Sequence, residues 1–360
     1  MSMIQTPLQI HHCSRDILVG SIGSRLLVSS DGHAWSHVSS IVAYGSLLHR
    51  LRYVAIQGRL GRRLVRGGIR HAIQLDDSLI TVFGKRFYRI SRNPADPPES
   101  AIPAAPCIGS NPLCAPVAMD LDRGASGTTR AVFYGEYRPN PERSPVHVWR
   151  SDDEGMTFWP AWQFTGVRHV HGVFVDPFDP GVLWATTGDD DHESAIYRTD
   201  DQFATLEPVV AGSQQTRAVD LIFTADAVYF GSDTPREQNW WYRLDRRSGR
   251  VERQIPVPGS VFWATTTPDG WRIFSTVVEK SDANPYRYSE LIAAPPGKDE
   301  WRTLLRLHKD PFHDKFFDHG QIRLPAGPGR AGEIWITPYA VAGDQTVRRV
   351  DLTTSWRERA

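Results

Sequence analysis

The stretch "HVHGVFVDPFDPGVLWATTGDD" (169–190) carries the pattern that decides the fold. Two short runs of β-branched and aromatic residues flank a tight Asp-Pro turn, and an acidic loop follows the second run. The segment "RAVDLIFTADAVYFGSDTP" (217–235) repeats this outline of strand, polar turn, strand and acidic loop. Short apolar runs bounded by turn residues are typical of β-strands. The two segments therefore predict a repeated pair of strands.

The same outline recurs along the chain, in the segments 70–85, 116–137, 261–280 and 320–340. Third and fourth strands follow several copies, and we place the starts of seven units near residues 8, 66, 115, 167, 215, 259 and 317. A four-stranded unit that recurs every roughly 40–50 residues is typical of a β-propeller. We therefore predict an all-β propeller of four-stranded antiparallel blades, with seven blades favoured over six. A pair of β-sandwiches is the main alternative fold.

The whole chain of 360 residues can form one domain, because all-β folds often reach this length as a single unit. The segment 41–68 interrupts the repeat with a basic amphipathic stretch. We therefore predict one propeller over residues 1–360, with a helical or looped insertion at 41–68.

Charge and hydropathy exclude several kinds of partner. The 41 basic residues balance the 41 acidic ones, so no global field attracts nucleic acid or an anionic membrane. No apolar run is long enough to span a bilayer, and residues 1–16 lack the pattern of a signal peptide. We therefore expect a cytoplasmic protein that binds neither nucleic acid nor a membrane.

Cys13, Cys107 and Cys114 are the three cysteines of the chain. Their spacing matches no metal-binding pattern, and an odd number argues against a disulfide framework. We expect buried reduced thiols, and a small loop closed by Cys107 and Cys114 is the alternative.

The turn "SDDEGMTFW" (151–159) matches the Asp-box pattern Ser-x-Asp-x-Gly-x-Thr-Phe. "SSDGHAW" (29–35) is a version one residue shorter, and "TDDQFATL" (199–206) is a degenerate one. With these turns, the chain resembles a group of bacterial BNR-repeat, sialidase-like propeller proteins, best over about residues 130–245. The resemblance implies a propeller in which the aspartates of these turns have a structural role.

Strand direction places the polar ends of successive repeats on one face. In an up-and-down blade the first strand leaves that face and the second returns to it, so the start of one meets the end of the other. His169 and His171 begin a first strand, and Asp189 follows the second. Arg217 and Asp233 occupy the equivalent positions of the next repeat. We therefore expect these side chains to meet at one mouth of the central channel.

Equivalent positions in the other repeats supply the rest of the candidate residues. The predicted catalytic residues are His169, His171, Glu136, Tyr137 and Asp189. The predicted substrate-binding residues are Arg217, Asp190, Asp233, His71, Trp263, His319 and Tyr339. Glu279 lies at a further equivalent position around the ring.

The two histidines of the opening stretch lie two residues apart, so both project to the same side of a regular strand. They could bind a metal with His319 or a carboxylate, act as an acid–base pair, or form structural hydrogen bonds. Because no second histidine-rich stretch at fixed spacing supports a metal, we predict no metal and no cofactor. Arg217 either clamps a sugar carboxylate or forms a salt bridge with Asp189 or Glu136.

These residues favour an enzyme that cleaves a glycosidic bond in an acidic oligo- or polysaccharide. A hydrolase would pair Glu136 with a carboxylate of the loop 189–191. A lyase would neutralise a uronate with Arg217, and a histidine of the strand or Tyr137 would take the C5 proton. A non-catalytic saccharide- or protein-binding scaffold that uses the same face is the alternative.

The family resemblance extends to the candidate site in residue type only. Glu136 with Tyr137 resembles the Tyr/Glu nucleophile pair of sialidases. Sialidases also use a triad of channel-facing arginines for the substrate carboxylate, and the sequence shows no clear counterpart of that triad.

Overall fold

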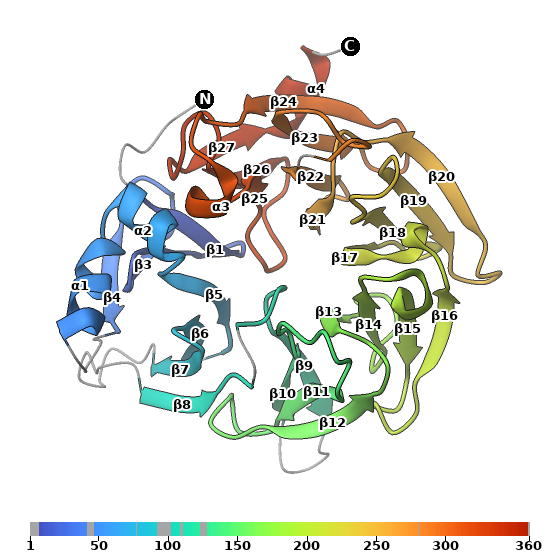
Figure 1. Cartoon of the computed structure of the whole chain (residues 1–360), viewed down its shortest axis with the longest axis horizontal. Coiled ribbons are helices and arrows are strands. Elements are labelled where there is room, and N and C mark those ends of the chain that lie inside the picture. Colours follow the sequence, from blue (N-terminus) through green and yellow to red (C-terminus); the bar gives the residue numbers. More distant parts are fainter. Residues whose placement is uncertain are drawn as a thin grey trace.

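The computed structural model describes residues 7–41, 47–76, 78–91, 102–108, 111–122, 128–279 and 281–358. Their strands form five four-stranded sheets and one seven-stranded sheet, and neighbouring strands of these sheets are antiparallel. The sheets follow one another around a central axis, with the first strand of each sheet innermost (Figure 1). The predicted all-β, antiparallel class is therefore confirmed.

Each four-stranded sheet contains four strands that are consecutive along the chain. The first two sheets are β1–β4 (Gln9–Cys13, Leu18–Ile22, Arg25–Ser29, Ser36–Ser40) and β5–β8 (Ile69–Gln74, Ser78–Phe83, Arg86–Ser91, Ile102–Pro106). The next three are β9–β12 (Val117–Asp122, Thr128–Gly135, Val146–Ser151, Trp159–Phe164), β13–β16 (His169–Val175, Leu183–Gly188, Ala195–Thr199, Glu207–Ala211) and β17–β20 (Ala218–Phe223, Ala227–Ser232, Trp240–Asp245, Val251–Pro256).

The seven-stranded sheet combines two sets of consecutive strands. They are β21–β24 (Val261–Thr266, Arg272–Val278, Tyr288–Ala294, Arg302–His308) and β25–β27 (Gly320–Arg323, Glu333–Tyr339, Arg348–Asp351). The sets are joined where β22 pairs with β25, with Val277 opposite Gln321 and Val278 opposite Gly320. The short helices α3 (Asp314–Phe317) and α4 (Leu352–Arg357) precede and follow the second set.

Contacts between the two ends of the chain close the ring. The Cys13 N–H donates to the carbonyl oxygen of Ala326 at 2.8 Å, and the Ile10 N–H donates to Thr337 Oγ1 at 3.0 Å. These bonds place β1 beside the last strands, and Figure 1 shows β1 next to β25 and β26.

The core lies between neighbouring sheets. For example, Phe133 and Val148 of one sheet pack with Val170 and Leu183 of the next, and all four are buried. Between two other sheets, the Trp241 and Phe274 rings stack with their centroids 3.9 Å apart. Such aromatic pairs contribute about 0.5–1.5 kcal/mol beyond the burial of their area. Apolar packing therefore joins successive sheets around the ring.

The segment 41–68 contains the two helices α1 (Leu47–Ala55) and α2 (Arg59–Val65). Arg63 of α2 is buried and pairs with Asp310 at 2.5 Å, and it also donates to the carbonyl oxygen of Phe317 at 2.8 Å. This ion pair fixes α2 against the segment around α3. Across the described residues, every helix is too short or too polar to cross a bilayer.

All three cysteines are free, as the sequence predicts. Cys13 and Cys107 are buried, and burial raises the pKa of both thiols to about 12. These thiols are therefore protonated at neutral pH and poorly reactive.

Three turns between a third and a fourth strand share one hydrogen-bond pattern. In the turn after β11, Asp153 accepts from Ser151 Oγ at 2.7 Å and from the Thr157 N–H at 2.8 Å. The turns after β3 and β15 repeat the pattern with Asp31 and Asp201. These aspartates hold the turns at the end of the strands that lies away from the start of the inner strands.

Replacing Asp153 with alanine removes the acceptor of the Ser151 and Thr157 hydrogen bonds. We expect the free energy of unfolding to fall by about 1 kcal/mol, the typical contribution of a hydrogen bond. Denaturant-induced unfolding measures this change. Ligand binding at the other end of the strands should be unchanged, so a folded Asp153→Ala protein that has lost binding would contradict the structural role.

Candidate functional site

Antiparallel pairing brings the start of an inner strand to the end of its neighbour. His169 at the start of β13 pairs with Gly188 at the end of β14, and Asp189 follows directly. In the next sheet the Asp233 N–H donates to the carbonyl oxygen of Arg217 at 2.8 Å. His169, Asp189, Arg217 and Asp233 line one cavity of about 600 Å³ at this end of the inner strands.

The Asp189 carboxylate is the centre of this cluster. Arg168 Nη1 donates to Oδ2 at 2.8 Å, and Arg217 Nη2 lies 2.9 Å from Oδ1. The Nε2 atoms of His169 and His171 lie 3.4 Å and 3.9 Å from the same Oδ1. Burial acts to raise the pKa of Asp189, but the two histidines and Arg217 hold it well below its usual range. Asp189 is therefore ionised.

Arg217 forms a salt bridge, one of its two predicted roles. Besides Asp189 it contacts Asp233 Oδ2 at 3.2 Å, while Glu136 is not one of its partners. Although burial opposes the charged form, Asp233 and Asp189 raise the pKa of Arg217. Arg217 thus connects two adjacent sheets and has its charge compensated within the protein.

Both histidines are oriented by backbone carbonyl oxygens. His169 Nδ1 lies 3.3 Å from the carbonyl oxygen of Arg138, and His171 Nδ1 lies 2.8 Å from that of Ala218. The Tyr137 ring lies against His169, with centroids 4.2 Å apart. Burial lowers the pKa of His169, although Asp189 acts in the opposite direction.

Nine of the twelve predicted site residues line this cavity. They are His169, His171, Tyr137, Asp189, Arg217, Asp233, Trp263, His319 and Tyr339. Glu279 lines it too.

Glu136, Asp190 and His71 lie elsewhere. Glu136 accepts hydrogen bonds from Arg138, His147 and Trp149 inside its own sheet, because its side chain faces the neighbouring strand β11. The expected pairing of Glu136 with the loop 189–191 is therefore absent.

The other two residues are held by neighbouring groups. Asp190 forms ion pairs with Arg143 and Arg236 outside the cavity wall. His71 Nε2 lies 3.0 Å from the carbonyl oxygen of Pro112 and lines a second cavity.

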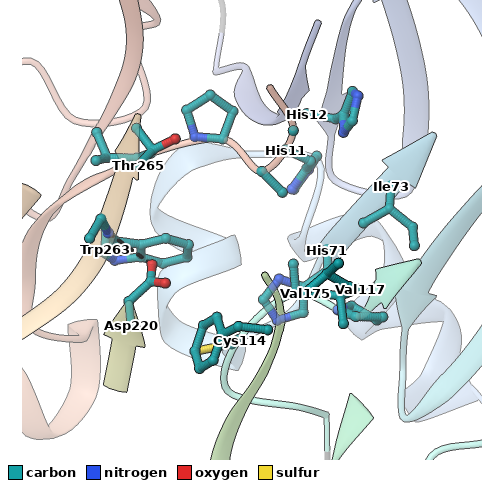
Figure 2. Close-up of a pocket in the computed structure, with 18 of the residues that line it drawn as sticks. His11, His12, His71, Ile73, Cys114, Val117, Val175, Asp220, Trp263 and Thr265 are labelled. Atoms are coloured by element: carbon teal, nitrogen blue, oxygen red, sulfur yellow. Dashed lines mark hydrogen bonds between the residues drawn. The ribbon is translucent and has the colours of Figure 1, made fainter. Parts of the chain in front are cut away.

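The second cavity, of about 590 Å³, lies toward the other end of the inner strands. Figure 2 shows Trp263 and Asp220 across this cavity from His11 and His71. Burial lowers the pKa of His71 to about 3 and raises that of Asp220 to about 7. Asp220 also accepts the Ala264 N–H at 2.8 Å. Because these polar groups are engaged with the backbone, we place the candidate site in the first cavity.

Arginines that the sequence did not indicate line the opposite wall of the first cavity. They form a set that we call the basic wall: Arg62, Arg66, Arg70 and Arg323. With Arg217, three of the arginines in this cavity lie on or next to an inner strand (Arg70, Arg217 and Arg323). The Asp318 carboxylate lines the cavity near this wall. Burial acts to raise the pKa of Asp318, but the positive charges of Arg323 and Arg70 lower it.

Two guanidinium groups of the basic wall form no direct ion pair with a carboxylate of the described residues. Arg323 is 6 % exposed, donates to Gln9 Oε1 at 3.1 Å and lies 3.6 Å from the centroid of the Tyr339 ring. Its Nε atom has no hydrogen-bond partner, and burial lowers its pKa. Within the described residues, the Arg70 side chain forms neither a hydrogen bond nor an ion pair.

A backbone irregularity explains why Arg70 was missed. The pairing of β5 with β6 shifts register between Ile69 and His71, and β13 has the same shift between Val170 and Gly172. Such a bulge adds one residue to a strand and breaks the simple alternation of its side chains. The comparison of equivalent positions in the repeats selected His71, whereas Arg70, at the bulge, lines the first cavity as well as the second.

Comparisons with known proteins agree with the fold. No family model matches the chain, and no curated protein matches it. Among solved structures, a puromycin-hydrolyzing peptidase from Mycobacterium tuberculosis has a TM-score of 0.54 and 13% identity, covering 97% of this chain and 52% of its own. The GH74 enzyme of Niastella koreensis has a TM-score of 0.51 and 12% identity, covering 84% of this chain and 44% of its own.

An oligogalacturonate lyase solved in complex with manganese has a TM-score of 0.52 and 9% identity, covering 97% of this chain and 92% of its own. The chain thus spans about half the length of the peptidase and the GH74 enzyme, but nearly all of the lyase. These three structures are β-propeller proteins, and at such low identity the likeness shows the fold alone.

The pKa of Glu279 gives a test of the charges in the cavity. Burial, followed by the charge of Asp233, raises it to about 7. The unfolded chain releases the Glu279 proton near pH 4.5, whereas the folded protein holds it up to about pH 7. The contribution of Glu279 to the free energy of unfolding is therefore greatest at low pH and is lost as the pH rises through about 7.

Glu279→Gln removes this titration and keeps an acceptor for Ser260 Oγ. We therefore expect the variant to gain stability relative to the wild type between about pH 5 and about pH 8. Urea unfolding at both values measures the difference. Glu207→Gln, on the exposed edge of β16, is the control and should show no such trend. An equal effect of Glu279→Gln at both pH values would contradict the raised pKa.

Proposed function

We propose that the protein is a carbohydrate-active enzyme that binds an acidic oligo- or polysaccharide in the first cavity and cleaves a glycosidic bond there. The observation that carries this proposal is the pair of guanidinium groups, Arg70 and Arg323, that form no direct ion pair with a carboxylate among the described residues. Asp318 compensates part of their charge, and an anionic ligand would compensate the rest. A uronate carboxylate has the planar geometry that an arginine binds through two parallel hydrogen bonds.

The rest of the wall suits a sugar ring. Trp263, Tyr137 and Tyr339 line the same cavity, with the Tyr137 ring against His169 and the Tyr339 ring against Arg323. Ligand sites typically combine such aromatic surface with a few polar groups that fix orientation. Two solved proteins with this fold, a GH74 enzyme and an oligogalacturonate lyase, are consistent with saccharide chemistry on a propeller.

Among the two reactions, elimination is favoured by the basic wall. Arginines that neutralise the uronate carboxylate make the C5 proton more acidic. The C5–H bond then breaks, its electrons form a C4–C5 double bond, and the C4–O bond to the leaving sugar breaks as that oxygen takes a proton. His319 lines the cavity, and an imidazole is a suitable base for the C5 proton.

A hydrolase is the second candidate, with a different carboxylate pair from the one that the sequence suggested. Glu279, with its pKa raised to about 7, can donate a proton, while Asp189 stays ionised. Two carboxyl groups whose environments separate their pKa values are typical of a general acid and its partner.

Incubation with uronate-containing, sialylated and neutral oligosaccharides separates these outcomes. New reducing ends together with the ultraviolet absorbance of an unsaturated uronate would indicate a lyase. New reducing ends alone would indicate a hydrolase. Binding of the acidic glycan without cleavage would overturn the enzymatic part of the proposal and favour the binding scaffold.

Arg70→Met tests the role of the basic wall. Removing a charge-assisted hydrogen bond should weaken the binding of an acidic oligosaccharide about tenfold or more, and leave a neutral one unaffected. Calorimetric titration measures both affinities. Arg130→Met is the matched control, because Arg130 lines the second cavity and is paired with Asp120 at 2.7 Å. Equal losses in the two variants would speak against the basic wall as the anion site.

We also infer that the ring is a single domain of seven blades. The strand sets β21–β24 and β25–β27 follow the order of the other sheets and are joined by only two residue pairs, so they can be counted as two blades. The shared turn hydrogen bonds of Asp31, Asp153 and Asp201 support the resemblance to BNR-repeat propellers.

A further inference from the structure

Three potential metal ligands converge where the sheet β13–β16 meets the first cavity. One ligand atom each of His169, His171 and Asp189 lies within 4.8 Å of the others. Their side chains are 7 %, 1 % and 14 % exposed, so the surrounding protein holds them in place. Across the described residues, no other group of three histidine, cysteine or acidic side chains meets this spacing.

Hydrogen bonds decide which nitrogen of each imidazole faces the cluster. The Nδ1 atoms of His169 and His171 both lie against backbone carbonyl oxygens. A carbonyl oxygen can only accept, so Nδ1 carries the hydrogen in both rings. In a neutral ring the Nε2 atom then carries a free electron pair. A backbone carbonyl on the second nitrogen is also a usual outer contact of a metal-binding histidine.

Both Nε2 atoms are directed at another acceptor. They lie 3.4 Å and 3.9 Å from Asp189 Oδ1. Arg217 supplies positive charge to Oδ1, but it leaves the electron pairs of the two Nε2 atoms without a partner. A proton can join only one nitrogen to the oxygen, and 3.9 Å is too long for a hydrogen bond. A metal cation satisfies all three donors at once.

We propose that His169 Nε2, His171 Nε2 and Asp189 Oδ1 form a site for a divalent first-row transition-metal ion. Tetrahedral bonds of about 2.0–2.2 Å place ligand atoms about 3.4 Å apart. The His169 separation equals this value, and the His171 separation is longer, so His171 moves inward when the ion binds. Two imidazoles and one carboxylate suit Zn²⁺, Mn²⁺ or Fe²⁺, and they leave coordination positions open toward the cavity.

The charges around the cluster accommodate a dication. Arg168 and Arg217 add positive charge at Asp189, but Asp233 and Glu279 line the same cavity. Asp233 Oδ1 is buried without a hydrogen-bond partner and can accept from a metal-bound water. Arg217 keeps its contact with Asp233 Oδ2 when Asp189 Oδ1 binds the metal.

Calorimetric titration of chelator-treated protein with Zn²⁺, and separately with Mn²⁺, tests the site. We expect one equivalent of at least one of these ions to bind per chain. His171→Ala should weaken that binding at least about tenfold. His319→Ala is the matched control, because it removes a histidine that lines the same cavity outside the cluster, and it should bind the ion as the wild type does.

His169→Gln is a second ligand variant, and circular dichroism shows which variants fold. The proposal is overturned if the wild type binds neither ion, if a folded ligand variant binds as well as the wild type, or if His319→Ala loses binding equally. No saccharide enters this measurement, so its result is independent of the proposed function.

Discussion

The antiparallel pairing of each inner strand with its neighbour is the constraint on which the site depends. Because β14 returns to the end where β13 begins, Asp189 lies beside His169 whatever the loop between the strands contains. The same pairing in β17 and β18 places Arg217 beside Asp233. Two hairpins of adjacent sheets therefore supply the whole cluster, and the ion pair between Asp189 and Arg217 connects them.

The cavity separates two kinds of charge. On one side, Asp189 and Asp233 share Arg217, so their charges are balanced within the protein. On the other side, the guanidinium groups of the basic wall outnumber the carboxylate of Asp318. Side chains whose charges compensate one another keep their positions without a ligand. Positive side chains in excess are stabilised most when an anion binds. The first side suits chemistry that needs fixed groups, and the second suits recognition.

The repeat of strands and the end at which their polar residues gather could be predicted, since both follow from the spacing of apolar runs and from strand direction. The orientation of individual side chains could not. Glu136 lies near the predicted end, but donors such as His147 turn its carboxylate back into the sheet. Arg70 and Arg323 were missed for another reason: each is a single charged residue in a strand sequence that shows no special pattern. Only the shared cavity, and the bulge beside His71, show that they belong together.

The helical insertion has a consequence for how this protein can diverge. Arg62 and Arg66 of the basic wall come from or directly follow α2, outside every strand ladder, and Arg63 fixes that helix by its ion pair with Asp310. The hydrogen-bonded ring does not need the sequence of this insertion. Under the proposed function, a change in the length or charge of this insertion would alter the preferred anion, while the hairpins that carry Asp189 and Arg217 stay the same. The proposed anion recognition and the strand ladders would then be encoded in separable segments of the chain.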